Sequence, residues 1–434
     1  MARPRILIVG GGFAGYHAAR QLGRMARGRA EIMLLNPTDY FLYLPLLPEV
    51  ATGILEPRHA SVSLTRTLRG VRVVLGRADS VHPDRRVVRY TDPEDRHGEL
   101  GYDRLVLAAG SVNKLLPIPG VAEYARGFRG VPEALFLRDH MIRQVELATA
   151  TEDQAERDAR CTFVVVGAGY TGVEVAAGAQ LFVAELVRRR WRPEPLHPRW
   201  LLLDTAARVL PELDPRLSAI AERVLRGRGV EVRTGVSVKQ ATPDGVQLSD
   251  GEFVPTRSLI WCVGVRPDPV VAEMGLPTRK GRLVVDEYLT VPGHPEIFGC
   301  GDVAAVPDLH RPGQITPMTA QHAVRQGKLA ARNVAASYGR GRPRPYKHRE
   351  LGFLVDLGGA QAAADPLGVA LSGPAAKLLT RGYHLASLPG NRIRVGVDWL
   401  LAAALPRQAV QLGLVRSPSV PLDTASPELP AIPR

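Results

Sequence analysis

The sequence has little cysteine. Its 434 residues include only Cys161, Cys262 and Cys300, and no two of them lie within four positions of each other. Local C-x-x-C pairs are therefore absent, and we expect neither a disulfide scaffold nor a cysteine zinc cluster, and no metal site. This cysteine usage suits a reducing compartment.

Long hydrophobic runs are also missing. No stretch approaches the roughly 18 to 20 apolar residues that a bilayer crossing requires. The first apolar run, Ile6 to Val9, follows only five residues, which leaves no room for the longer apolar region of a signal peptide. We therefore expect a cytoplasmic protein whose contact with a membrane is peripheral.

Lysine is scarce, whereas arginine is abundant. Six Lys and fifty Arg contribute to a formal net charge of +13, which alone would favour nucleic acid or an anionic membrane surface as partner. No nucleic-acid recognition motif accompanies this charge, so we expect no nucleic acid partner. The length favours two or three domains, and the hydrophobic fraction of 45% is that of a globular protein.

A strand, a glycine-rich turn and a helix follow one another near the N-terminus. The apolar run 6–9 precedes Gly10-x-Gly12-x-x-Gly15, helical spacing follows to Met25, and a second strand covers 30–35. In this pattern the first glycine permits a tight turn, the second lets the backbone approach a pyrophosphate, and the third lets helix and strand pack closely. The pattern predicts a dinucleotide site at the helix N-terminus, formed by the turn and the first helical residues, namely Gly10, Gly12, Phe13, Ala14 and Gly15.

The same pattern recurs about 157 residues later. Strand 162–166 precedes the second turn, a helix runs to about Arg190, and another strand covers 200–203. The sequence therefore predicts an α/β protein with two Rossmann-like dinucleotide-binding domains. The residues that we assign to the second site are Gly167, Gly169, Tyr170, Thr171 and Gly172.

Each unit has a polar residue at the end of its second strand, where a ribose would bind. Asn36 follows Gly15 by 21 residues and accepts hydrogen bonds more weakly than the usual acid. Asp204 is the corresponding candidate in the second unit, and its carboxylate would repel a 2′-phosphate, which favours NADH over NADPH. An ordinary turn aspartate is the alternative for Asp204.

A third motif suggests which cofactor binds first. Gly299-Cys300-Gly301-Asp302 precedes an apolar run, and Leu105 to Gly110 precedes the second unit. Together these features resemble the two-dinucleotide-binding flavoproteins related to disulfide reductases. The resemblance implies FAD at the first site, with Gly301 and Asp302 at the ribityl chain, and an NADH domain inserted into the FAD domain.

Three further passages resemble type II NADH:quinone dehydrogenase. They are Leu44 to Gly53, Gly110-Ser111 with Ile118 to Val121, and Ala320 to Ala323, and the order of features matches from residue 6 to about 400. The resemblance implies further FAD contacts at Pro45, Leu46, Ala109, Gly110, Ala320 and Gln321, and further NADH contacts at Glu174 and Gly264. It also implies a quinone as electron acceptor.

The helix containing Gln321 is expected to begin at the N-cap Thr316, to have Pro317 as its first residue, and to run about 22 residues. In the family this helix points its N-terminus at the flavin ring. Gln321 and Arg325 would share one face at the quinone, and Arg325 stands where the family has Gln, whereas Gln326 lies about 100° further round. A packed helix with a solvent-facing Gln321 is the alternative.

Glu174 follows the second glycine turn and resembles a glutamate that the family places near the nicotinamide or the flavin. There it would orient the carboxamide or relay protons. An acid favoured by the macrodipole in the first helical turn is the alternative. The catalytic candidates are therefore Glu174, Gln321 and Arg325.

The last part of the chain is basic and amphipathic. The stretches 374–388 and 393–415 mix apolar residues with Lys and Arg, which suits helices lying on an anionic membrane surface. Helices packed on the core or forming a homodimer interface are the alternative. After Ser417 the composition predicts a disordered tail over 417–434.

These features predict five segments. An FAD-binding domain covers 1–135 and 271–345, an NADH-binding domain covers 136–270, and a C-terminal region for membrane association or dimerisation covers 346–416, before the tail. The expected function is ping-pong electron transfer from NADH through flavin to a quinone, without proton pumping, at the inner face of the cell membrane. A soluble diaphorase or ferredoxin reductase, and an NADH-sensing flavoprotein like apoptosis-inducing factor, stay open as alternatives.

Overall fold

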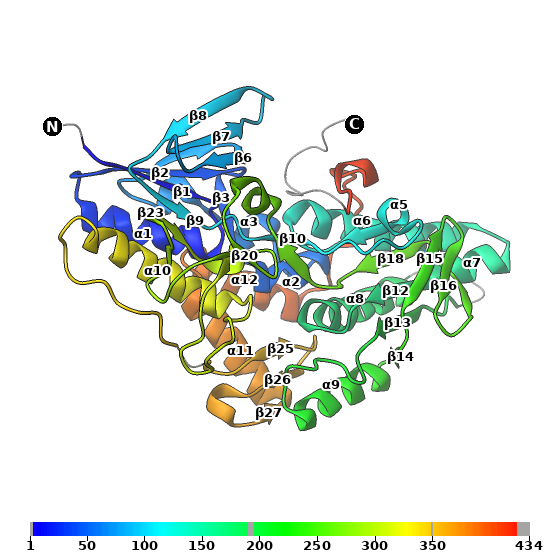
Figure 1. Ribbon diagram of the computed structural model, residues 1–434. Coiled ribbons are helices and arrows are strands. Elements are labelled where there is room, and N and C mark those ends of the chain that lie inside the picture. The colour runs from blue at the N-terminus through cyan, green and yellow to red at the C-terminus, as the bar shows by residue number, and fades with distance from the viewer. Residues whose placement is uncertain (1–2, 190–194, 349, 423–434) are drawn as a thin grey trace. The chain divides into compact units, whose positions relative to one another are not determined.

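The chain divides into two compact units, shown in the ribbon diagram of Figure 1. The computed structural model describes residues 3–189, 195–348 and 350–422. Unit 1 comprises Met1–Leu42, Ser61–Val112 and Val265–Glu350, and unit 2 comprises Tyr43–Ala60, Asn113–Gly264 and Leu351–Arg434. Residues 113–264 thus interrupt unit 1, which agrees with the expected insertion of one dinucleotide-binding fold into another.

Unit 1 is built on a six-stranded sheet with the order β22-β23-β9-β1-β2-β5, in which only β22 runs antiparallel to its neighbour. The central strands are buried on both faces, as expected for the apolar runs that form them. The strands are β1 (Arg5–Val9), β2 (Glu31–Asn36), β5 (Arg72–Leu75), β9 (Arg104–Leu107), β22 (Thr290–Val291) and β23 (His294–Gly299).

Two helices of unit 1 pack against each other beside this sheet. α1 (Phe13–Ala26) connects β1 to β2, and α10 (Ala320–Ala336) lies alongside it (Figure 1). Gly327 of α10 allows this approach, because a Cβ atom there would lie 2.0 Å from the backbone oxygen of Ala14. The backbones of α1 and α10 therefore lie in direct contact, although the two helices are about 300 residues apart in the sequence.

Smaller elements complete unit 1. They are the hairpin β3 (Tyr40–Leu42) and β4 (Ser61–Ser63), the meander β6 (Arg77–His82), β7 (Val87–Thr91) and β8 (His97–Gly101), the sheet of β20 (Thr278–Arg279), β21 (Arg282–Val284) and β24 (Ala304–Ala305), helix α4 (Leu64–Thr67), and the 3-10 turns η2 (Pro269–Met274) and η3 (Gly301–Val303). Strands β10 (Ser111–Asn113) and β19 (Val265–Pro267) occur where the chain passes between the units.

Unit 2 contains a second, fully parallel sheet with the order β11-β18-β12-β13-β14. All five residues of β12 are buried, so this sheet too has an apolar interior. The strands are β11 (Ala125–Gly127), β12 (Thr162–Val166), β13 (Arg199–Asp204), β14 (Val230–Thr234) and β18 (Ser258–Trp261), and a small sheet holds β15 (Val238–Thr242), β16 (Gly245–Leu248) and β17 (Phe253–Pro255).

The helices of unit 2 come from widely separated parts of the chain. The short helix α2 packs against α6 and α8, although more than 70 residues separate α2 from α6 in sequence. The helices and turns of this part are η1 (Leu44–Leu46), α2 (Leu47–Ala51), α3 (Pro57–Ala60), α5 (Val121–Tyr124), α6 (Val131–Ala150), α7 (Gln154–Cys161), α8 (Tyr170–Arg188) and α9 (Pro215–Gly227).

The C-terminal part of unit 2 folds as a small sheet covered by helix α11, and Ala362, Ala364 and Ala376 form its core. Its elements are β25 (Leu354–Asp356), β26 (Ala362–Ala364), β27 (Leu371–Ser372), the 3-10 turns η4 (Pro366–Gly368) and η5 (Ser417–Ser419), and helices α11 (Gly373–Ser387) and α12 (Arg392–Ala404). The two basic stretches expected to be helical are thus helical over 373–387 and 392–404.

The predicted disordered tail was wrong for its first residues. Val420 and Leu422 are buried, and Leu422 joins the apolar core that contains Val164 and Leu201 of the parallel sheet. The proline- and serine-rich composition did not predict this burial, because it involves only two apolar side chains, Val420 and Leu422. Residues 423–434 of the predicted tail lie outside the described residues.

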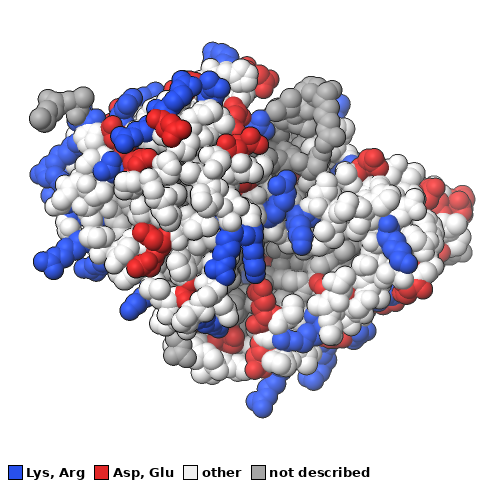
Figure 2. All heavy atoms as spheres, viewed as in Figure 1, with Lys and Arg blue, Asp and Glu red and all other residues white. Residues whose placement is uncertain are grey.

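Basic side chains do not stand alone on the face drawn in Figure 2, where acidic side chains lie among them. Many basic side chains of the chain form ion pairs, such as Arg89 with Glu99 at 2.9 Å. Within residues 3–189, 195–348 and 350–422, no helix is both long and apolar enough to cross a membrane.

Candidate functional site

The first glycine turn joins β1 to α1 as the spacing predicts. Gly10 has φ = +95°, and a Cβ atom on it would lie 2.4 Å from the backbone oxygen of Ala108. Gly15 touches the turn itself, because its Cβ atom would lie 1.7 Å from the Gly10 oxygen. Around Gly12, the N-cap of α1, a Cβ atom would meet nothing within 4 Å. The turn is therefore tight at its first and third glycines and open at its second, as a bound pyrophosphate requires.

The second turn repeats this geometry between β12 and α8. Gly167 has φ = +100°, and its Cβ atom would lie 2.3 Å from the oxygen of Cys262, while that of Gly172 would lie 1.7 Å from the Gly167 oxygen. Gly169 again opens on empty space and is the N-cap of the helix. Tyr170 and the adjacent Thr171 begin the helix, just as Phe13 and Ala14 begin α1. Both turns thus fit a dinucleotide phosphate.

The two ribose candidates occupy equivalent positions. The backbone N–H of Gly11 donates to Asn36 Oδ1 at 2.6 Å, and that of Ala168 donates to Asp204 Oδ2 at 2.5 Å. Asn36 also donates through Nδ2 to the oxygen of Thr38 at 2.9 Å, whereas Asp204 Oδ1 accepts from Ala206 at 2.7 Å. Both side chains therefore hold the glycine turn in place, and only Asp204 brings a carboxylate to it.

The Gly-Asp turn lies beside the first glycine turn, since a Cβ atom on Gly301 would be 3.0 Å from Cβ of Ala14. Ser111 Oγ donates to Asp302 Oδ2 at 2.6 Å, which orients the carboxylate. Gly301 N–H donates to Gln326 Oε1 at 2.8 Å. Asp302 is thus fixed next to the open N-terminus of α1, where the resemblance expects a ribityl chain.

Helix α10 begins later than predicted. Thr319 is the N-cap and accepts from the N–H of His322, and the helix has 17 residues rather than about 22. Thr316 is not a cap, because its Oγ1 accepts from Gln326 Nε2 at 3.0 Å and its carbonyl accepts from Arg282 Nη1 at 2.7 Å. Tertiary hydrogen bonds therefore replace the local cap that the Thr-Pro pair suggested. Ala320 remains the first helical residue of the motif.

The two candidate quinone residues on α10 lie close together. Arg325 Nη1 donates to the backbone oxygen of Gln321 at 2.9 Å, one helical turn back. His348 Nε2 donates to Gln321 Oε1 at 2.7 Å. Gln326, by contrast, is buried and bridges Gly301 and Thr316, so its role is to hold the Gly-Asp turn. The predicted separation of Gln326 from the Gln321 and Arg325 face is confirmed.

The remaining predicted contacts lie at strand ends and turns. Ala109 and Gly110 follow β9, and Gly264 follows β18, with φ of +82° at Gly110 and +90° at Gly264. Pro45 and Leu46 belong to the turn η1 in unit 2.

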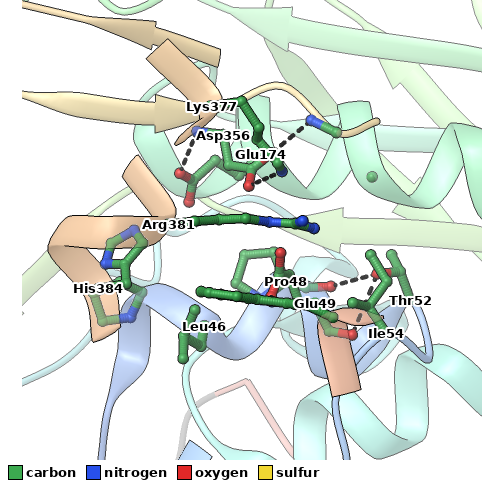
Figure 3. A pocket seen from close by; sticks show the side chains of 14 residues that line it. Leu46, Pro48, Glu49, Thr52, Ile54, Glu174, Asp356, Lys377, Arg381 and His384 are labelled. Carbon is green, nitrogen blue, oxygen red and sulfur yellow. Dashed lines mark hydrogen bonds and ion pairs between the residues drawn. The ribbon is translucent and has the colours of Figure 1, made fainter. Parts of the chain in front are cut away.

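A pocket in unit 2 gathers ionisable side chains from four segments of the chain (Figure 3). Glu174 comes from α8, and its Oε1 accepts from the backbone N–H of Asp356 at 2.9 Å. Lys377 of α11 donates through Nζ to Asp356 Oδ2. Across the pocket, Trp399 Nε1 donates to Glu49 Oε2 at 2.6 Å. The lining residues are Pro45, Leu46, Pro48, Glu49, Thr52, Ile54, Glu174, Gly178, Asp356, Gly358, Lys377, Arg381, His384 and Trp399.

Two of the acids in this pocket, Glu174 and Glu49, hold their protons at unusually high pH. Burial, reinforced by the charge of Asp356, raises the pKa of Glu174 to about 8 and that of Glu49 to about 7. Lys377 acts in the opposite direction on both groups without cancelling the effect of burial. Two carboxyl groups that exchange protons near neutral pH therefore line one pocket, a pattern typical of functional sites.

Most residues of this pocket were missed by sequence reasoning. Glu49, Asp356 and His384 were not candidates, and Lys377 and Arg381 were counted with a membrane-facing basic surface. That interpretation was wrong for both cations, because they face the pocket. The sequence did contain one indication of this basic face, because Lys377, Arg381 and His384 are spaced so that they share one side of a predicted helix.

A third C-terminal cation also faces protein rather than solvent. Arg407 lies 3.4 Å from Glu185 and is only 16% exposed. The charge available to attract anionic lipid is therefore smaller than the composition suggested.

Two sheets of mainly parallel strands, each with an open glycine turn at a helix N-terminus, define a protein that binds two dinucleotides. The chain belongs to the pyridine nucleotide-disulphide oxidoreductase family, whose model matches residues 4–327. Within that family it belongs with the type II NADH:quinone oxidoreductases, because it is 32% identical to one from Mycobacterium tuberculosis over 91% of this chain and 85% of the relative. The resemblance inferred from the motifs is thereby confirmed.

Other relatives agree with this assignment. A demethylphylloquinone reductase from Synechocystis is 31% identical over 92% of this chain and 96% of its own length. The structure of NDH2 from Plasmodium falciparum in complex with NADH matches with a TM-score of 0.85, covering 94% of this chain and 100% of that one, at 18% identity. At that identity the structural match supports the predicted fold alone.

Proposed function

We propose that the protein is an FAD-dependent NADH dehydrogenase that delivers electrons to a quinone. The observation that carries the proposal is the position of Glu174. It stands in the first turns of α8, the helix that begins at the second glycine turn, and it also lines the acid-rich pocket. One short segment thus links a dinucleotide turn to a pocket suited to proton transfer.

The nucleotide contacts follow from the two turns. The N–H groups at the start of α1 and α8 offer partial positive charge to the pyrophosphates of FAD and NADH. Asp302, oriented by Ser111, would accept hydrogen bonds from the hydroxyls of the FAD ribityl chain. Asp204 keeps the second site selective for NADH, because its carboxylate repels a 2′-phosphate. When bound, FAD takes two electrons from NADH and passes them on, so substrate and acceptor react in separate half-reactions.

Reduction of a quinone to a quinol consumes two electrons and two protons. Glu174 and Glu49 hold protons near neutral pH because burial raises their pKa values. They can therefore release a proton in the pocket and regain one from solvent. From the family resemblance we also assign Gln321 and Arg325 of unit 1 to the reaction with quinone, and His348 Nε2 orients the Gln321 amide by a hydrogen bond. No step moves protons across a membrane.

We further propose that α11 and α12 rest on the inner face of the cell membrane. Large apolar side chains on these helices are strongly exposed, and Leu378 is 76%, Ile393 83% and Leu400 72% accessible. Such residues on short amphipathic helices suit an interfacial position, where a lipophilic quinone would also be found. Homodimerisation through the same surface is the competing arrangement.

Steady-state kinetics with NADH and a panel of acceptors tests the function. We expect quinones to be reduced faster than ferredoxin or oxygen, with the parallel double-reciprocal lines of a ping-pong mechanism. Faster turnover with ferredoxin would make the protein a ferredoxin reductase. Slow turnover with every acceptor, together with a long-lived NADH complex, would indicate a sensor like apoptosis-inducing factor.

A further inference from the structure

Helix α11 turns three basic side chains towards the pocket. Lys377, Arg381 and His384 are spaced four and three residues apart, so they share one helix face. Their surroundings differ. Lys377 is paired with Asp356, and burial lowers the pKa of His384 to about 4, which leaves its ring neutral at physiological pH.

Arg381 differs from Lys377 because it lies in no ion pair within the described part of the chain, although its charge lowers the pKa of the nearby Glu49. Among the residues that the structure describes, no acidic side chain forms an ion pair with it, and its Nε is buried without a hydrogen-bond partner. A buried guanidinium nitrogen without a partner costs free energy unless a ligand supplies one. Figure 3 shows the side chain extending between Asp356 and Glu49, into the space that the pocket residues enclose.

The guanidinium is also held in place. Its Cζ lies 4.8 Å from the centre of the Trp399 ring, which gives a cation–π contact. Trp399 is in turn fixed by its 2.6 Å hydrogen bond to Glu49. Arg381 therefore keeps a set orientation before any ligand arrives, and its planar N–H groups are suited to an oxygen anion.

We propose that Arg381 binds the negatively charged oxygen of the reduced acceptor, so that the pocket prefers quinones whose head group carries an anionic oxygen. This inference rests on the proposed function. The quinone takes up two electrons and one proton, which bound FAD would supply after its reduction by NADH, and both carbonyl carbons become part of an aromatic ring. The product is a singly charged quinolate, which Arg381 stabilises until a carboxyl group of the pocket donates the second proton.

Ligand binding to the oxidised, FAD-loaded protein tests the proposal without turnover. The probes are 2-hydroxy-1,4-naphthoquinone, ionised at pH 7.5, and neutral 1,4-naphthoquinone, and isothermal titration calorimetry gives both Kd values. For Arg381→Met we expect a rise of about tenfold or more in the Kd of the anion and a change of less than about twofold for the neutral quinone. Equal losses for both probes, or no loss, would overturn the proposal.

Control variants separate charge from folding. Arg381→Lys keeps the charge but not the planar stacked group, so it should bind the anion more tightly than Arg381→Met and less tightly than the wild type. Arg381→Gln repeats the charge removal with a polar side chain. Arg223→Met makes the same change at an exposed site on α9 and should leave both Kd values unchanged. Flavin content and ferricyanide reduction by NADH verify that each variant is folded.

Steady-state kinetics separate a failure of the proposed quinone reduction from a failure of the proposed role of Arg381. A wild-type protein that reduces ferricyanide but neither quinone would overturn both the proposed function and the role of Arg381. A wild-type protein that reduces both quinones, with an unchanged ratio of kcat/KM for the two in Arg381→Met, would overturn the role of Arg381 alone.

Discussion

Asn36 and Asp204 each accept a backbone hydrogen bond from the glycine turn of their own site. Each accepts the backbone N–H of the residue that follows the first glycine of its turn, at 2.6 Å from Gly11 and 2.5 Å from Ala168. Since an amide suffices to hold the first turn, the negative charge of Asp204 is not needed to hold the second. We infer that the charge serves selection of the nucleotide.

This equivalence gives a sharp test of nucleotide preference. Asp204→Asn should keep the turn intact, as Asn36 does, but lose the repulsion of a 2′-phosphate. We expect the ratio of kcat/KM for NADPH to that for NADH to rise by about tenfold, which corresponds to about 1.4 kcal/mol. Asn36→Asp is the matched control, because it adds a charge at the other turn and should leave the ratio unchanged. If this kcat/KM ratio is the same in Asp204→Asn as in the wild type, Asp204 only holds the turn and does not select the nucleotide.

Flavin retention should depend on Asp302 and on the residues that orient it. Asp302→Ala should purify with much less flavin, measured from the absorbance at 450 nm relative to 280 nm, and a full yellow spectrum would refute the assignment. Ser111→Ala removes only the 2.6 Å hydrogen bond that orients the carboxylate, so the loss should be smaller, with the Kd for FAD raised by about tenfold. Ser80→Ala, also in unit 1, should retain flavin as the wild type does.

The raised pKa of Glu174 predicts how stability depends on pH. Below about pH 4.5 the carboxyl group is protonated in both the folded and the unfolded chain, so its full contribution is present. As the pH rises towards 8, the unfolded chain releases the proton while the folded chain keeps it, and the free energy of unfolding falls by at most about 1.4 kcal/mol per pH unit.

Glu174→Gln removes this titration. The thermal unfolding midpoint of the variant minus that of the wild type should therefore increase between pH 5 and pH 8, as measured by differential scanning calorimetry. The exposed Glu212→Gln is the control and should follow the wild type at every pH. Parallel curves for Glu174→Gln and the wild type would mean that Glu174 ionises normally in the folded protein.

The two glycine turns were predictable from sequence because their geometry is local. Gly10 and Gly15 contact backbone within the turn or on the neighbouring strand, and spacing alone specifies them. The start of α10 was not predictable in this way. Thr316 has the sequence features of a cap, yet Gln326 and Arg282, distant in sequence, occupy its hydroxyl and carbonyl groups.

The acid-rich pocket was beyond sequence reasoning for a related reason. Glu49, Glu174, Asp356 and Lys377 come from four separate segments, and no spacing rule connects them. The raised pKa values of Glu49 and Glu174 arise from burial, which depends on the whole fold of unit 2. The basic residues of α11 looked like a lipid-facing stripe because sequence cannot show which face of an amphipathic helix is covered.

The position of these residues changes how membrane binding should be tested. Deleting α11 would remove Lys377 and Arg381 and damage the pocket, so point substitutions on α12 are preferable. Ile393 and Leu400 are exposed and lie two helical turns apart on one face of α12. Replacing both by Asp should weaken binding to vesicles that contain anionic lipid by about tenfold or more, because it removes apolar contact and adds repulsion.

Sedimentation with vesicles of phosphatidylglycerol and phosphatidylcholine measures this binding. Phe253→Asp, an exposed apolar residue on β17, is the control and should bind as the wild type does. Reduction of a water-soluble quinone should be unchanged in the double variant, because the pocket is intact. If the double variant bound vesicles normally but changed from dimer to monomer in sedimentation velocity, the exposed face of α12 would be a contact between two copies of the chain.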